Sequence, residues 1–202
     1  MPVFGQTRAA LAAAAARGAD ILSSLRLVMT AEALTAPVPA QALELNTELE
    51  VLCDACRELA ACRGGWLYLC PVTLPRVRIC PAEEVQPAAL PRGLLHGVVL
   101  SFLRGVLRSG GRAVIRVLPY GEAAVLTLQG GRPDRMPGDL PALLHRCGAY
   151  VTTGDGGRYA AAVRMAPAQG LPLREAPALA ELLLDRYSAP RVYLQGFCVE
   201  EE

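Results

Sequence analysis

The sequence contains no lysine, only two histidines and a single asparagine, Asn46. Its formal net charge is +1, so no basic excess points to nucleic acid or an anionic membrane as a partner. No apolar run approaches the roughly 18 residues that span a bilayer, and Met1-Pro2 does not open a signal peptide. We therefore expect a cytoplasmic protein with no membrane insertion and no nucleic-acid partner.

Cysteine occurs at seven positions, but only Cys53 and Cys56 have the C-x-x-C spacing of zinc sites and redox pairs. No second such pair follows, and His96 and His145 are isolated in the sequence, so we expect no metal site. Cys53 and Cys56 lie one helical turn apart beside Leu52, where free cysteine packs as a small apolar residue. We expect both thiols to be buried.

The first 40 residues are expected to form a helical arm. Gln6–Leu34 is alanine-rich and predicts one long helix, which Pro37 and Pro39 end. Its apolar stripe consists of Ile21, Leu22, Leu25, Val28 and Met29. Such a stripe needs an apolar partner. We expect a homodimer through residues 6–34 or docking of this helix on the rest of the chain.

Residues 41–202 are expected to form one domain that contains two well-signalled helices. Thr47 and Glu50 fit the capping box of a helix over 47–63. Apolar residues at three- and four-residue steps predict a helix over 91–108, which Ser109-Gly110-Gly111 ends.

The strands of this domain are predicted by alternation and turn residues. Residues 112–128 alternate on both sides of a turn at Gly121 and predict a β-hairpin. The other expected elements are strands at Trp66–Cys70, Arg76–Cys80 and Arg191–Phe197, helices at Leu140–Gly148, Arg158–Ala166 and Ala176–Tyr187, and loops at Ala82–Pro91 and Ala149–Gly157. This order predicts an α+β fold, a two-layer sandwich with helices 47–63 and 91–108 on one face of a mixed sheet.

From about Leu11 to Phe197 the chain resembles the cytoplasmic end of a sensor histidine kinase. Arg17–Leu34 resembles the helix that ends the dimerisation hairpin, and Leu43–Leu59 resembles the first helix of the ATP-binding domain. Leu94–Leu107 lies where the family has its N-box helix. The resemblance implies the histidine-kinase and Hsp90-like (GHKL, or Bergerat) ATPase fold and a role in two-component signal transduction.

The sequence departs from the family where ATP would bind. The family's N-box asparagine holds the magnesium that bridges the ATP phosphates, and this chain has Gly105 there, with Ser101 one turn earlier. Gln129 or Gly130 replaces the aspartate that accepts a hydrogen bond from adenine. The resemblance therefore implies a vestigial nucleotide pocket at Ser101, Gly105, Arg108, Gln129, Gly131, Gly154, Gly156 and Gly157.

These departures favour a degenerate kinase-like protein, a non-catalytic pseudokinase without a cofactor. It would bind a histidine kinase, a response-regulator receiver domain or its own copy. We expect no catalytic residue, and we interpret His96 and His145 as partly buried or surface residues. The alternative is a divergent ATP-binding kinase or ATPase that binds ATP and magnesium with altered ligands, in which Arg104, Arg108, Arg132 or Arg158 would pair directly with the ATP phosphates.

A third alternative is a phosphotransferase of the sporulation-phosphorelay type. We do not favour it, because such a protein would need a histidine on the helical arm and no histidine precedes His96. Pro172–Phe197 departs from the family's usual ending. We expect an extra helix in this segment to cover either the sheet edge or the vacated nucleotide pocket.

Overall fold

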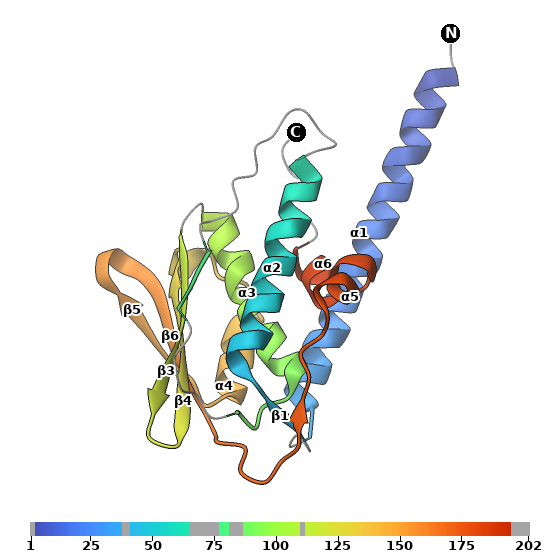
Figure 1. The fold of residues 1–202 in the computed structure, drawn as a ribbon. Coiled ribbons are helices and arrows are strands. Elements are labelled where there is room, and N and C mark those ends of the chain that lie inside the picture. Colours follow the sequence, from blue (N-terminus) through green and yellow to red (C-terminus); the bar gives the residue numbers. More distant parts are fainter. Residues whose placement is uncertain (1–2, 38–40, 65–76, 81–86, 110–111, 195–202) are drawn as a thin grey trace.

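The computed structural model describes residues 3–37, 41–64, 77–80, 87–109 and 112–194, and its main sheet has five strands (Figure 1). The strands are β2 (Val77–Cys80), β3 (Ala113–Tyr120), β4 (Ala123–Gly130), β5 (Tyr150–Gly154) and β6 (Arg158–Met165). They lie in the order β2-β3-β4-β6-β5. Among the described pairs of this sheet, only β2 and β3 are parallel, so the sheet is mixed, as predicted. The hairpin predicted over 112–128 is confirmed as β3 and β4.

The helices form the second layer. They are α1 (Val3–Thr35), α2 (Leu45–Gly64), α3 (Arg92–Ser109), α4 (Leu140–Arg146), α5 (Leu179–Leu184) and α6 (Ala189–Leu194). Helices α2 and α3 lie on the same face of the sheet (Figure 1), and both contribute to one core. Leu52 of α2 and Phe102 of α3 are fully buried in that core with Ile115 of β3. The predicted α+β sandwich behind a helical arm is confirmed.

Helix α1 packs on the domain with its second half, while its first half projects away from the domain (Figure 1). The docked part contacts α3, α4 and α6. Thr30 and Ala33 are buried there, and Met29 packs against the core. Ile21 and Val28, however, are 55% and 52% exposed. Docking therefore covers only part of the predicted apolar stripe, and self-association stays a prediction.

The segment after α4 differs from its prediction. Residues 149–157 were expected as a loop and Arg158–Ala166 as a helix, but β5 and β6 form a second hairpin. The helix prediction was wrong because the run Tyr159-Ala160-Ala161-Ala162 has alanine's helical preference, whereas strand pairing decides its conformation. β6 lies between β4 and β5 and is hydrogen-bonded on both sides.

The C-terminal segment packs on the helices. Strand β7 (Leu173–Arg174) pairs parallel with β1 (Ala42–Leu43), α5 packs on α2, and α6 packs on α2, α3 and α1. The expected extra helix is present as α5, but the described part of this segment packs on helices and not on the edge of the main sheet, and covering of the nucleotide pocket stays a prediction. Where a strand was predicted from Arg191, the chain forms α6, which begins after Ser188 with Pro190 in its first turn.

Several predicted features lie wholly or partly outside the described residues. The strand Trp66–Cys70 and the turn glycines Gly110-Gly111 fall there, as do residues 82–86 of the expected loop and the part of the C-terminal strand beyond Leu194. The described elements nevertheless include every residue expected in the nucleotide pocket.

Candidate functional site

Ser101, the first residue of the predicted pocket, is part of the contact between α3 and the start of α4. Its side chain is fully buried, and its hydroxyl donates a hydrogen bond of 3.1 Å to Oδ2 of Asp139. Asp139 directly precedes α4. The Ser101 hydroxyl is therefore engaged within the protein.

Gly105 and Gly131 lie on two sides of Met136. A Cβ at Gly105 would come 2.4 Å from Met136 Sδ, 3.0 Å from Pro137 Cδ and 3.1 Å from Met136 Cα. A Cβ at Gly131 would come 2.6 Å from Met136 Cε, and its backbone has a φ of +67°, which favours glycine. Since the Met136 backbone also stands close to Gly105, position 105 has no room for any side chain without movement of this loop.

The end of α3 is tied to the same connection between β4 and α4. Ser109 Oγ donates to the carbonyl of Gly105 over 2.7 Å and accepts from the backbone N–H of Arg132 over 3.0 Å. The connection then continues through the short helix η1 (Pro133–Arg135), which packs on α3. Arg108 is exposed in the last turn of α3. The space beside the end of α3 is thus filled by residues of the connection.

Gln129, another residue of the predicted pocket, lies apart from Ser101, Gly105 and Gly131. Gln129 is exposed between Val114 and Ala160, on the sheet face opposite the buried Leu128. The structure therefore brings Ser101, Gly105 and Gly131 together around the Met136–Asp139 connection and does not bring Gln129 to them.

The three remaining glycines lie in the β5–β6 turn. Gly154 pairs with Arg158, and Gly156 and Gly157 have φ values of +70° and +73°. Such positive φ values are those in which glycine costs least. These conformations are those of an ordinary glycine turn, and the part of this loop in the vestigial nucleotide pocket stays a prediction.

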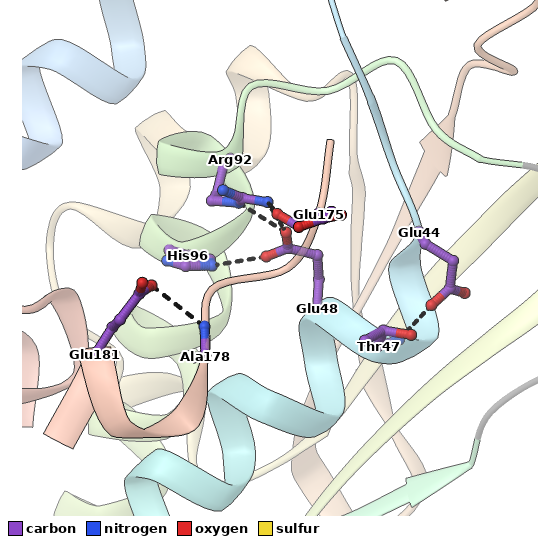
Figure 2. A network of polar contacts seen from close by, with 8 residues as sticks. All are labelled: Glu44, Thr47, Glu48, Arg92, His96, Glu175, Ala178 and Glu181. Atoms are coloured by element: carbon purple, nitrogen blue, oxygen red, sulfur yellow. Dashed lines mark hydrogen bonds and ion pairs between the residues drawn. The ribbon is translucent and has the colours of Figure 1, made fainter. Parts of the chain in front are cut away.

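A second polar site lies toward the other end of α3, where Glu48, Arg92 and His96 meet (Figure 2). Glu48 is in the first turn of α2 with a fully buried side chain. Its Oε1 accepts from Arg92 Nε over 2.7 Å, and its Oε2 accepts from His96 Nε2 over 3.2 Å. Arg92 Nη2 also contacts Glu48 and donates to the carbonyl of Glu175. This cluster thereby joins α2, α3 and the C-terminal segment.

The pairing also determines the electrostatics of Glu48. Burial alone would raise the pKa of Glu48, but the hydrogen bonds from His96 and Arg92, together with the charges of those two residues, outweigh it and lower the pKa below 4.5. The carboxylate is therefore ionised at neutral pH. Because both of its oxygens have partners within the protein, the cluster links three segments and offers no evident catalytic group.

Sequence reasoning missed this cluster, although a signal was present. Leu45, Glu48 and Leu52 follow each other at helical spacing, so Glu48 is a charge within a buried apolar stripe. The predicted capping box at Thr47 and Glu50 was wrong. The carboxylate of Glu44 instead accepts from the backbone N–H groups of Asn46 and Thr47, over 3.1 and 2.7 Å.

The other titratable side chains singled out in the sequence are buried or isolated. Cys53 and Cys56 are 1% and 3% exposed, which confirms their predicted burial. Burial raises the pKa of the Cys53 thiol to about 12, so it is protonated and unreactive at neutral pH. His96 is buried and His145 is exposed on α4.

In the part of the chain that the structure describes, no helix is long and apolar enough to cross a membrane.

Comparison with known proteins found no match by sequence but several solved structures of similar fold. No family model matches the chain. No curated protein matches it either. The structure is similar to that of full-length ShkA in complex with AMPPNP, with a TM-score of 0.54 and 13% identity, over 81% of this chain and 40% of ShkA. The chain thus spans less than half the length of ShkA.

Two other solved structures are similar at lower scores. The histidine kinase AdeS of Acinetobacter baumannii has a TM-score of 0.48 and 8% identity, over 71% of this chain and 76% of AdeS. The cytoplasmic segment of the histidine kinase QseC has a TM-score of 0.44 and 13% identity, over 71% of this chain and 91% of that segment. At such identities a similarity shows a shared fold and leaves the chemistry to the residues themselves. The chain thus has a histidine-kinase-like α+β fold.

Proposed function

We propose that this chain is a signalling protein with a histidine-kinase-like fold that acts by binding another protein, without ATP-dependent phosphotransfer. The observation that supports this proposal is the close packing of Met136 and Pro137 against Gly105. The resemblance to the family implies that Gly105 occupies the N-box position, and a metal-holding side chain there would meet Met136 and Pro137. A fold survives on its core, whereas a site needs particular side chains.

The neighbouring residues support the same conclusion. Magnesium in a nucleotide site takes oxygen ligands such as amides and carboxylates. The Ser101 hydroxyl is buried and already donates to Asp139, and Gln129 is exposed on the far face of the sheet. Binding of Mg-ATP in the family's manner would require the connection between β4 and α4 to move away from α3. It would also require metal and adenine ligands other than the Ser101 hydroxyl and the Gln129 amide.

Calorimetric titration of the full chain with ATP, ADP and a non-hydrolysable analogue, with and without magnesium, tests the proposal. We expect no saturable heat below about 1 mM, because the loss of one charged hydrogen bond alone costs about 1.5–3 kcal/mol, or one to two powers of ten in affinity. Saturable binding that Arg108→Ala weakens and Arg174→Ala does not would favour the alternative, a divergent ATP-binding kinase. Arg174 is the matched control because it is an exposed arginine on β7, outside the predicted pocket.

The proposed partner is a histidine kinase, a receiver domain or a second copy of this chain. The exposed apolar residues Ile21, Leu27 and Val28 of α1 support binding through the arm, since soluble proteins seldom leave a contiguous apolar strip in water. Light scattering of the same full-chain sample distinguishes the second copy from the other two partners. A dimer supports self-association through residues 6–34, and a monomer leaves the arm to another protein.

A further inference from the structure

The five-stranded sheet has one face that the described helices leave open (Figure 1). Along β3 the residues Ala113, Ile115 and Val117 are buried toward the helices, while Arg116 and Leu118 point the other way and are exposed. The same alternation holds along β4 and β6. We call the outward residues of β3, β4, β5 and β6 the open face.

The strand register places unlike residues side by side across the open face. Arg116, Thr127, Ala162 and Tyr150 form one row over four strands. The middle of this row is small, and its two ends are an arginine and a tyrosine that is 76% exposed. The strands that carry these two side chains are therefore about three strand spacings, or roughly 14 Å, apart.

A second pair of large side chains is ordered on the same face. The guanidinium of Arg164 lies over the ring of Tyr120, 5.2 Å from its centroid. Leu118 faces Val125 in the register, and Val125 faces Arg164. Tyrosine and arginine are the residues most enriched where protein interfaces bind tightly, and a pair already in contact loses less side-chain freedom on binding.

Charge on the sheet is of one sign. None of the five strands that the structure describes contains an aspartate or a glutamate, and arginine occurs at positions 78, 116, 158 and 164. Because the whole chain has a net charge of only +1, the residues outside these strands are net acidic. The described strands therefore carry a local excess of positive charge, and the exposed arginines Arg116, Arg158 and Arg164 lie on the open face.

We propose that the open face binds an acidic segment of another protein, with carboxylates that pair with Arg116 and Arg164 and apolar side chains that pack on Leu118 and Tyr150. This surface goes beyond the proposed function and is independent of ATP binding and of α1. Two copies would not pair through this face, since it would bring like charges together. Nucleic acid is disfavoured because its affinity rests on several basic contacts to phosphates, whereas these arginines stand among apolar residues.

Fluorescence anisotropy of the full chain with labelled peptides of about twelve residues tests the proposal. The probe alternates glutamate with leucine or tyrosine, its counterpart has lysine for glutamate, and a thymidine oligonucleotide of similar length is the third ligand. We expect the acidic peptide to bind at least about tenfold more tightly than either, with an affinity that falls as salt rises. The double variant Arg116→Glu/Arg164→Glu should weaken binding at least about tenfold, and Arg174→Glu on β7 should leave it within about twofold.

Failure of the acidic peptide to bind below about 1 mM overturns the proposal, as does equal weakening by Arg174→Glu. Tighter binding of the oligonucleotide also overturns it and assigns the face to nucleic acid. If the double variant does not fold, Tyr150→Ser removes an exposed contact without a charge change and should weaken acidic-peptide binding on its own. The ATP titration and the light scattering do not depend on Arg116, Arg164 or Tyr150, so their outcomes are separate from this one.

Discussion

The two ends of helix α3 bury opposite kinds of side chain. At its first turns, Arg92 and His96 surround the carboxylate of Glu48, a polar cluster inside the helical layer. Toward its last turns, where the family's nucleotide chemistry was expected, Gly105 packs on Met136 and Pro137. The first end therefore depends on charge pairing and the second on volume.

This contrast shows that the two ends of α3 are held to their neighbours by different interactions. Both carboxylate oxygens of Glu48 have a partner, one in Arg92 and one in His96. These pairings offset the free-energy cost of removing the three side chains from water. At Gly105 the contact is steric, and the hydrogen bonds of Ser109 hold the connection in place. Substitutions at the two ends should therefore differ in size and in their dependence on pH.

The largest effect is expected from Glu48→Leu, which leaves the buried His96 and the half-buried Arg92 without the carboxylate that they share. Breaking a buried ion pair from one side costs about 3–5 kcal/mol of the free energy of unfolding. Urea unfolding at neutral pH measures this loss. The matched control is Glu50→Gln, an exposed carboxylate on the same helix, which should change the free energy by less than about 0.5 kcal/mol.

The triple variant Glu48→Leu/Arg92→Met/His96→Leu sharpens this test. With all three polar groups replaced, no charge stays buried and unpaired, and most of the lost stability should return. A single variant as stable as the native protein would show that the cluster contributes nothing to the fold.

A smaller loss is expected from Gly105→Ala, because the new methyl group meets both Met136 and Pro137. Overpacking costs about 1–3 kcal/mol, and alanine's better helix propensity returns about 0.5–1 kcal/mol. The control Gly93→Ala lies in the same helix with no atom within 4 Å and should be neutral or slightly stabilising. Recovery in the double variant Gly105→Ala/Met136→Ala would locate the clash, and an unchanged midpoint for Gly105→Ala alone would contradict the close packing.

The smallest effect is the pH dependence of the polar end. The pKa of Glu48 is lowered in the folded protein, so the unfolded chain binds its proton more readily. The stabilisation is fully present above the ordinary value of 4.5 and is lost as the pH falls below it. The difference in unfolding midpoint between the native protein and Glu48→Leu should therefore shrink from neutral pH toward about pH 4. A constant difference would contradict the lowered pKa, and Gly105→Ala should show no such trend.

Local patterns in the sequence predicted elements that bury one face. The apolar periodicity of α2 and α3 and the alternation of β3 and β4 led to elements with nearly the observed bounds. The burial of Cys53 and Cys56 followed from the same periodicity. Each of these patterns repeats within one element and needs no information from a distant segment.

Predictions failed where conformation depends on a distant neighbour. The alanine run of β6 becomes a strand because β4 and β5 pair with it on both sides. The segment around Val192, predicted as a strand, becomes helical in α6, where the Tyr193 hydroxyl shares a hydrogen bond of 3.1 Å with Thr30 of α1. In both places tertiary contacts outweigh a propensity difference of at most about 1 kcal/mol per residue.

By itself the sequence determined which helices carry an apolar face and where the first hairpin turns. Only the tertiary structure decided that Glu48 meets Arg92 and His96 across 44 and 48 residues of chain, and that Met136 closes on Gly105 and Gly131. The physical reason is the range of the interactions. Helical and strand periodicity act between near neighbours, whereas ion pairing and close packing depend on which distant segments the fold brings into contact.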